Sequence, residues 1–178
     1  MASAIALWKA DIRAALMDVK AVFQERYGYP PGENSATDPE VSGEEQTDNV
    51  AIPSSLVAFY LDVGELSIPD VHNGYFIHTL ELVKRGNWGH PKRIEVEIDG
   101  QALNEDILTF GSNGGGHLFC INRSNGAIYE LPHGEINEHN VYLGGLCNPK
   151  LVASSFEEFL HRLLSMTKDF AVGGSASL

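Results

Sequence analysis

Apolar residues near the start of the chain recur at every third or fourth position. Charged residues such as Asp11 and Lys20 lie between them, and the apolar positions are Ile5, Trp8, Ile12, Leu16, Val19 and Phe23. This spacing places the apolar side chains on one face of an α-helix. We therefore predict an N-terminal amphipathic helix whose apolar face packs against the rest of the domain.

A central segment repeats the helical spacing. In the stretch IPSSLVAFYLDVG (52–64), Pro53 suits the first turn of a helix and Gly64 can end it. The apolar face of this helix consists of Leu56, Phe59, Tyr60 and Val63. We predict a short central helix.

A third helix is indicated near the end of the chain. Ser154 or Ser155 precedes it, and Glu157 and Glu158 are placed for a capping box. Its apolar stripe is Phe156, Phe159, Leu160, Leu163 and Leu164. After this C-terminal helix we expect a frayed tail at residues 171–178.

Other segments have the pattern of half-buried β-strands. The stretches GYFIHTLELV (74–83) and KRIEVEID (92–99) are interpreted as strands, and in the second Ile94, Val96 and Ile98 alternate with charged residues. The stretches HLFCI and AIYEL flank NRSNG, whose Asn125-Gly126 pair tolerates positive φ. We predict that these two form a hairpin.

The segment 28–51 lacks any periodic pattern. It contains six carboxylates, three prolines and no lysine or arginine. Connections longer than about 15 residues are uncommon inside a compact domain and are either functional or disordered. We expect a mobile acidic loop.

Four glycines lie within six residues, at Gly111, Gly114, Gly115 and Gly116. A phosphate-binding loop places its glycines between a strand and a helix, but a strand-like segment follows here. Ser112 also lacks the G-x-S-x-G context of a strained nucleophile. We therefore predict a tight turn, a bulge or a close backbone approach, with positive φ at one or more of Gly114 to Gly116.

Composition sets the broad class of protein. A chain of 178 residues with 43% hydrophobic and 20% charged residues fits one globular domain. The net charge of -12 argues against direct binding to nucleic acid or anionic membranes and leaves a basic partner open. No run reaches the roughly 18 apolar residues of a membrane span, and residues 1–16 lack a secretion-signal pattern. We expect a cytoplasmic protein in which Cys120 is a small buried hydrophobe.

The histidines do not have the spacing of a metal site. His72 and His78 are six residues apart, as are His133 and His139, and neither pair matches H-E-x-x-H. The acidic pairs are explained by solvation and helix capping. We therefore expect no metal, no cofactor and no enzymatic activity.

Three motifs together resemble the SUKH superfamily, in the branch of a yeast cell-wall regulator. They are Ile52-Pro53 with Phe59, Phe110-Gly111 with Gly114 to Phe119, and Ser155 to Leu160. The resemblance covers roughly residues 50–164. It implies a single α+β domain at residues 1–170, in which a curved, mostly antiparallel sheet packs against the N-terminal, central and C-terminal helices.

The same resemblance implies a binding function. Bacterial members are frequently immunity proteins that neutralise a polymorphic toxin, and the fungal branch implies an alternative, a regulatory scaffold in a signalling complex. We hypothesise that the chain, as a monomer, occludes the active site of a basic, nuclease-type toxin domain by presenting carboxylates in place of its substrate. Loops beside a rigid sheet commonly carry binding groups. The candidate partner-binding residues are Asp62, Glu65, Asp70, His72, Glu130, His133 and Glu135.

Overall fold

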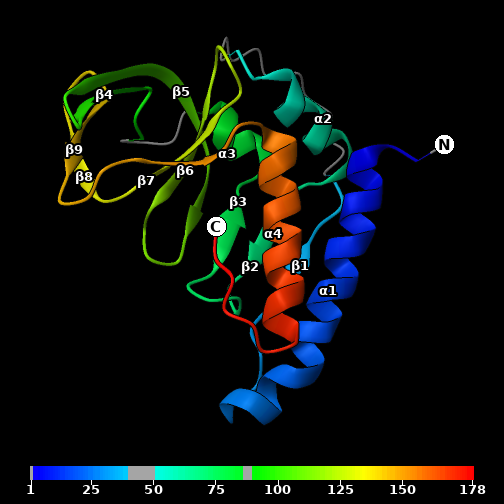
Figure 1. The fold of residues 1–178 in the computed structure, drawn as a ribbon. Coiled ribbons are helices and arrows are strands. Elements are labelled where there is room, and N and C mark those ends of the chain that lie inside the picture. The colour runs from blue at the N-terminus through cyan, green and yellow to red at the C-terminus, as the bar shows by residue number, and fades with distance from the viewer. Residues whose placement is uncertain (1, 40–50, 86–89) are drawn as a thin grey trace.

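The computed structural model describes residues 2–39, 51–85 and 90–178. These residues form an α+β domain in which helices cover one face of a curled sheet (Figure 1). The helices are α1 (Ala4–Tyr27), α2 (Ser54–Asp62), α3 (Leu80–Lys84) and α4 (Phe156–Ala171). The strands are β1 (Ser35–Ala36), β2 (Leu66–Ile68), β3 (Tyr75–Ile77), β4 (Arg93–Ile98), β5 (Gln101–Asn113), β6 (Leu118–Asn122), β7 (Ile128–Leu131), β8 (Gly134–Ile136), β9 (Val141–Gly145) and β10 (Lys150–Ala153).

The long strand β5 organises the sheet. One path runs in the order β1-β2-β3-β5-β4-β9-β8, and a branch from β5 continues through β6 and β7 to β10. The pairs are antiparallel apart from the parallel pairing of β4 with β9. Because β5 pairs with β4 in one half and with β3 and β6 in the other, the sheet curls into a half-barrel.

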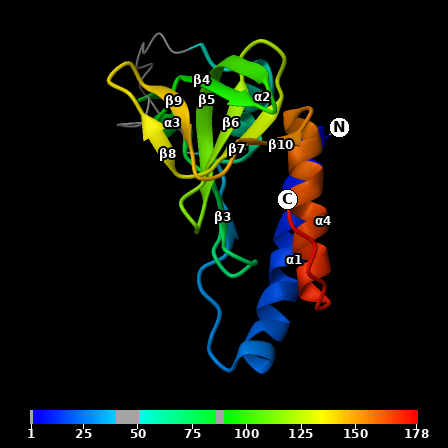
Figure 2. The ribbon, with the colours of Figure 1, turned by 60° about the vertical axis from the view of Figure 1, so that its left-hand side comes forward.

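Helices α1 and α4 lie side by side against the sheet (Figures 1 and 2). The indole nitrogen of Trp8 in α1 donates a hydrogen bond to the carbonyl oxygen of Leu160 in α4 over 2.8 Å. The predicted N-terminal and C-terminal helices are thus both confirmed. Ser155 is the N-cap of α4, and its hydroxyl accepts a hydrogen bond from the backbone nitrogen of Glu158.

The main core lies between the helices and the sheet. All eight residues that the periodicities place in one core are buried there: Trp8, Ile12, Leu16, Phe59, Phe110, Phe119, Phe156 and Leu160. A second, smaller core is formed by residues of β4, β5, β6, β7 and β9, namely Ile94, Ile107, Cys120, Leu131 and Tyr142. Cys120 is fully buried as expected, and burial raises the pKa of its thiol to about 12.

The central region differs from the expectation at one element. The stretch 74–83 is a strand only at Tyr75–Ile77, and its second half is helix α3. Thr79 causes the change, because its hydroxyl accepts a hydrogen bond from the backbone nitrogen of Leu82 and caps the new helix. Helix α2 is confirmed, although Pro53 is its N-cap and does not lie inside the first turn.

Part of the acidic segment 28–51 is ordered by contacts with α1 and β2. Ser35 and Ala36 form β1, which pairs with β2. The carboxylate of Asp38 contacts Lys9 and Arg13 at 2.5 and 3.2 Å. Residues 40–50 lie outside the described part of the chain, and the mobility of the segment stays a prediction.

The residues after α4 also differ from the expectation of a frayed tail. They turn back along the helix (Figure 2), and Leu178 is buried in the main core. The ammonium group of Lys150 on β10 donates a hydrogen bond to the carbonyl oxygen of Leu178. A buried leucine and a hydrogen-bonded backbone carbonyl hold the tail in place. Among the helices that the structure describes, none is long and apolar enough to cross a membrane.

Candidate partner-binding site

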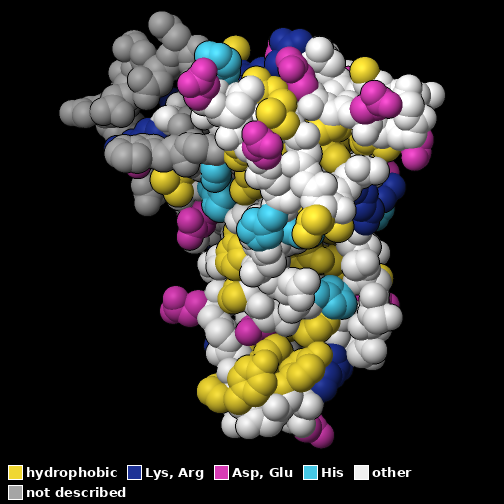
Figure 3. Space-filling model, turned by 90° about the vertical axis from the view of Figure 1, so that its left-hand side faces the viewer, with side chains coloured by type: hydrophobic (Ala, Val, Ile, Leu, Met, Phe, Trp, Pro, Cys, Tyr) yellow, Lys and Arg dark blue, Asp and Glu magenta, His cyan; other side chains and the backbone are white. Residues whose placement is uncertain are grey.

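Three turns meet at one end of the sheet and form a polar surface. The β2–β3 turn, the β5–β6 turn and the residues after β7 contribute its side chains. We call it the turn surface and define it by Asn73, Asn113, His117, Glu130 and His133. Figure 3 shows histidine side chains across the middle of this face of the molecule.

The glycine cluster brings the first two turns together. The backbone nitrogen of Gly114 donates to the carbonyl oxygen of Gly74 over 3.1 Å. A Cβ at Gly114 would lie 1.8 Å from the carbonyl oxygen of Asn73, so only glycine fits there. Gly116 has a φ of 79°, which confirms the predicted positive φ within the cluster. The glycines therefore permit a close backbone approach between two turns.

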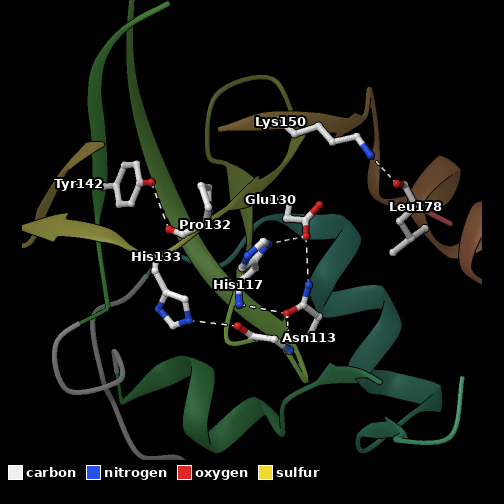
Figure 4. Close-up of polar contacts among 9 residues, drawn as sticks. Asn113, His117, Glu130, Pro132, His133, Tyr142, Lys150 and Leu178 are labelled. Atoms are coloured by element: carbon white, nitrogen blue, oxygen red, sulfur yellow. Dashed lines mark hydrogen bonds and ion pairs between the residues drawn. The ribbon is translucent and has the colours of Figure 1, made fainter. Parts of the chain in front are cut away.

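The third turn is joined to the glycine cluster through His133. Its Nε2 atom lies 3.0 Å from the carbonyl oxygen of Gly115. A Cβ at Gly116 would come within 2.6 Å of the His133 ring. The segment before His133 is held by the Tyr142 hydroxyl, which donates to the carbonyl oxygen of Pro132 over 3.1 Å (Figure 4). The position of His133 is thus set by the contact of its own ring with Gly115 and by the hydrogen bond from Tyr142 to the preceding residue, Pro132.

Glu130 is the centre of a hydrogen-bond network. Its Oε1 atom lies 2.9 Å from Nδ1 of His117 and accepts from the side-chain amide of Asn113 over 3.0 Å (Figure 4). The Asn113 oxygen accepts from the backbone nitrogens of Gly115 and His117, each over 3.0 Å. The side chain of Glu130 is only 18% exposed. Burial, followed by the negative charge of Glu130, raises the pKa of the neighbouring Tyr75 hydroxyl.

The structure divides the predicted partner-binding residues into groups. Glu130 and His133 belong to the turn surface, and Glu135 follows on the exposed strand β8. Asp70 and His72 lie in the β2–β3 turn beside Asn73. The ring of His72 packs edge-on against Phe170 with centroids 5.2 Å apart.

Two of the predicted carboxylates serve the fold. Asp70 accepts hydrogen bonds from the backbone nitrogen of Gly32 and the side chain of Asn34, over 2.8 and 2.5 Å. Asp62 accepts one from the hydroxyl of Ser3. Asp62 and Glu65 precede β2, whereas the β2–β3 turn follows it, so they lie at the opposite end of that strand from Asp70.

The predicted partner-binding residues do not include Asn73, Asn113 or His117. The position of His117 could have been predicted from the register of the hairpin, in which Leu118 pairs with Leu131 and Phe119 with Glu130. Counting two-residue steps outward from the Asn125-Gly126 turn places His117 beside Glu130 and Pro132. For Asn113, its contact with Glu130 depends on the fold of the β5–β6 turn, which the glycine pattern leaves open.

The turn surface combines one carboxylate, two imidazole rings and two side-chain amides on turns that are joined by hydrogen bonds. In the part of the chain that the structure describes, no three His, Cys, Asp or Glu side chains are grouped as metal ligands would be. The histidines His117 and His133 face each other nearly edge-on, with ring centroids 6.1 Å apart. The imidazole and amide groups of this surface can accept hydrogen bonds, and the carboxylate of Glu130 can attract a cation.

Comparison with known proteins identifies one family. The model of the SMI1 / KNR4 family (SUKH-1) matches residues 36–162. That range runs from β1 into α4 and includes every residue of the turn surface. A comparison with curated proteins finds no match.

Proposed function

The chain belongs to the SMI1 / KNR4 family (SUKH-1), and on this premise we propose that it is an immunity protein that binds and neutralises a cognate toxin domain. The partner is a basic, nuclease-type domain, and binding occludes its active site. The protein acts by binding and not by catalysis. Family membership carries the proposal, and charge supports the choice of partner.

The charge balance favours a basic partner. The chain carries 24 acidic and 12 basic residues. Such an excess attracts a nucleic-acid-binding surface and repels nucleic acid itself. Carboxylates that meet the basic groups of a nuclease take the place of its phosphate substrate. Long-range attraction then raises the association rate, while the lifetime of the complex depends on a close-packed centre.

The turn surface is the part of the molecule that we propose for this contact. Its backbone is fixed by hydrogen bonds between turns, so little ordering entropy is lost on binding. Glu130 and His133 lie on it, and the exposed carboxylate of Glu135 adjoins it. A fixed, partly acidic surface beside a rigid sheet meets the needs of a tight inhibitor.

The proposal predicts that a toxin domain is encoded beside the gene of this chain, and that domain provides the test. Co-expression should protect cells, and the purified pair should bind at nanomolar affinity or better, about -12 kcal/mol. The association rate should fall as salt rises. Loss of protection with the intact chain, or no binding by calorimetry, would rule out the proposed function.

A matched pair of charge reversals locates the surface. Glu135→Lys and Glu97→Lys both change an exposed strand residue by the same charge, but only Glu135 adjoins the turn surface. We expect Glu135→Lys to slow association by about 10-fold at low salt, and Glu97→Lys to have a smaller effect. Equal effects of the two variants would remove the turn surface from the interface.

A further inference from the structure

We infer that Glu130 is the receptor for an arginine side chain of the partner protein. This inference rests on the proposed function and specifies the chemistry of its contact. It follows from three features of the turn surface: the hydrogen-bond roles of its histidines, the position of Lys150 and the partial burial of the carboxylate.

The hydrogen-bond partners fix which ring nitrogens carry protons. A carboxylate only accepts, so the Nδ1 atom of His117, 2.9 Å from Glu130, carries hydrogen. A carbonyl oxygen also only accepts, so the Nε2 atom of His133, 3.0 Å from Gly115, carries hydrogen. In the neutral rings, Nε2 of His117 and Nδ1 of His133 are then acceptors. Each ring thus donates one N–H group to the protein itself, and in its neutral form keeps the other nitrogen as an acceptor.

Among the described residues, the contacts of Glu130 are made through Oε1, which leaves its Oε2 atom for an external cation. Asn113 and His117 both contact Oε1. Lys150 is the cross-strand neighbour of Glu130 and lies on the same face of the sheet. Its ammonium group binds the carbonyl oxygen of Leu178 and points away from Glu130 (Figure 4). Within the described residues, no lysine or arginine forms an ion pair with Glu130.

The surroundings of Glu130 select a guanidinium group over an ammonium group. The side chain of Glu130 is 18% exposed. The buried Tyr75 lies close to it, and after burial the charge of Glu130 is the second cause that raises the pKa of the Tyr75 hydroxyl. A cation must therefore lose water to reach it. Guanidinium is more weakly hydrated than ammonium, and its planar donors can also reach a lone pair of an adjacent ring.

The same chain supplies a control pair. His139 and Glu138 also place an imidazole beside a carboxylate, with Nε2 and Oε1 3.6 Å apart, but their side chains are 78% and 87% exposed. Full hydration screens such a pair. A probe that recognises the turn surface should therefore ignore His139.

The test is an NMR titration of the full chain with ethylguanidinium and with ethylammonium. Ethylguanidinium should shift the Asn113 side-chain amide and the His117 ring in a saturable manner, while ethylammonium binds at least about 5-fold more weakly. The shifts should vanish in Glu130→Gln, and His139 should not respond. A shift that persists in Glu130→Gln, equal binding of the two cations, or no saturable shift at His117 would overturn the inference.

The toxin domain provides the second part of the test. Glu130→Gln should weaken its binding by about 10-fold or more, mainly through a faster dissociation rate. If the toxin binds the intact chain and Glu130→Gln equally well, the inference is wrong and the proposed function stands. If the toxin does not bind the intact chain, the proposed function fails, and the assignment of a partner arginine fails with it.

Discussion

Phe156 joins three parts of the fold, so its removal gives a direct measure of the main core. Its side chain is 1% exposed. It makes edge-to-face contacts with Phe59 of α2 and Phe110 of β5, with ring centroids 5.5 and 5.4 Å apart. The change Phe156→Ala therefore leaves a cavity between a helix, a second helix and a strand.

The expected cost follows from these contacts. Buried Phe→Ala changes cost about 3–5 kcal/mol, and each aromatic pair contributes about 0.5–1.5 kcal/mol beyond burial. Because neither α2 nor the sheet can move into the cavity alone, we expect about 4–5 kcal/mol. For a domain of this size, that corresponds to a fall in melting temperature of about 8–20 °C.

Urea denaturation followed by circular dichroism is the appropriate assay. Phe156→Ala should lower the midpoint strongly, and Leu61→Ala, at an exposed position on α2, should leave it nearly unchanged. If Phe156→Ala does not fold, Phe156→Leu keeps the test open, with an expected loss of about 1–1.5 kcal/mol. A midpoint for either Phe156 variant equal to that of the unmodified chain would refute the assignment of Phe156 to the core.

Two further predictions concern the glycine cluster and acid stability. Gly114→Ala should destabilise the chain by about 1–3 kcal/mol and raise amide exchange around Gly74, because the new Cβ would overlap the Asn73 carbonyl. Gly115→Ala is the control and should cost less, because the nearest atom to its Cβ would be 3.2 Å away. Equal losses of stability in the two variants would contradict the close approach of the turns. Hydrogen bonds from Ser154, then from Arg162, lower the pKa of Glu158 from 4.5 to about 2, so its contribution to stability is complete above pH 4.5 and is lost as the pH falls to about 2. Glu158→Gln should thus be less stable than the unmodified chain at neutral pH, and urea midpoints that do not converge towards pH 2 would disprove this role.

The elements with a long and regular pattern could be predicted from the sequence. Helices α1 and α4 each place an apolar residue at every third or fourth position over several turns, and that period has one structural solution. The hairpin of β6 and β7 was predictable because Asn125-Gly126 interrupts two strand-like segments. All these signals are local.

The missed elements are short or depend on distant partners. Strand β1 has two residues, and it exists because β2 pairs with it. In the stretch 74–83, the alternation of apolar and polar residues favours a strand, whereas the intrinsic propensity of its second half favours a helix. The hydrogen bond that caps the helix at Thr79 stabilises α3. Leu178 is buried by packing against distant residues of the main core, which no local pattern encodes.

The candidate site was predicted in part for the same reason. Glu130 and His133 are close in the chain, so the sequence alone can place them near each other. The contact between His117 and Glu130 requires the hairpin register, and the approach of Asn73 to Gly114 requires β3 to pair with β5. Asp62 and Asp70 are acidic loop-like residues in sequence, but their carboxylates bind Ser3 and Asn34 within the chain.

The contact between the β2–β3 and β5–β6 turns bears on how such a protein can diversify. Asn73 and Gly74 meet Gly114 through main-chain atoms, so the side chain of residue 73, which is exposed, takes no part in holding the turns together. Mutation can therefore exchange that side chain while the framework keeps its shape, provided that the glycine is retained. If the turn surface binds a partner as proposed, its exposed side chains can change one at a time while the fold is retained.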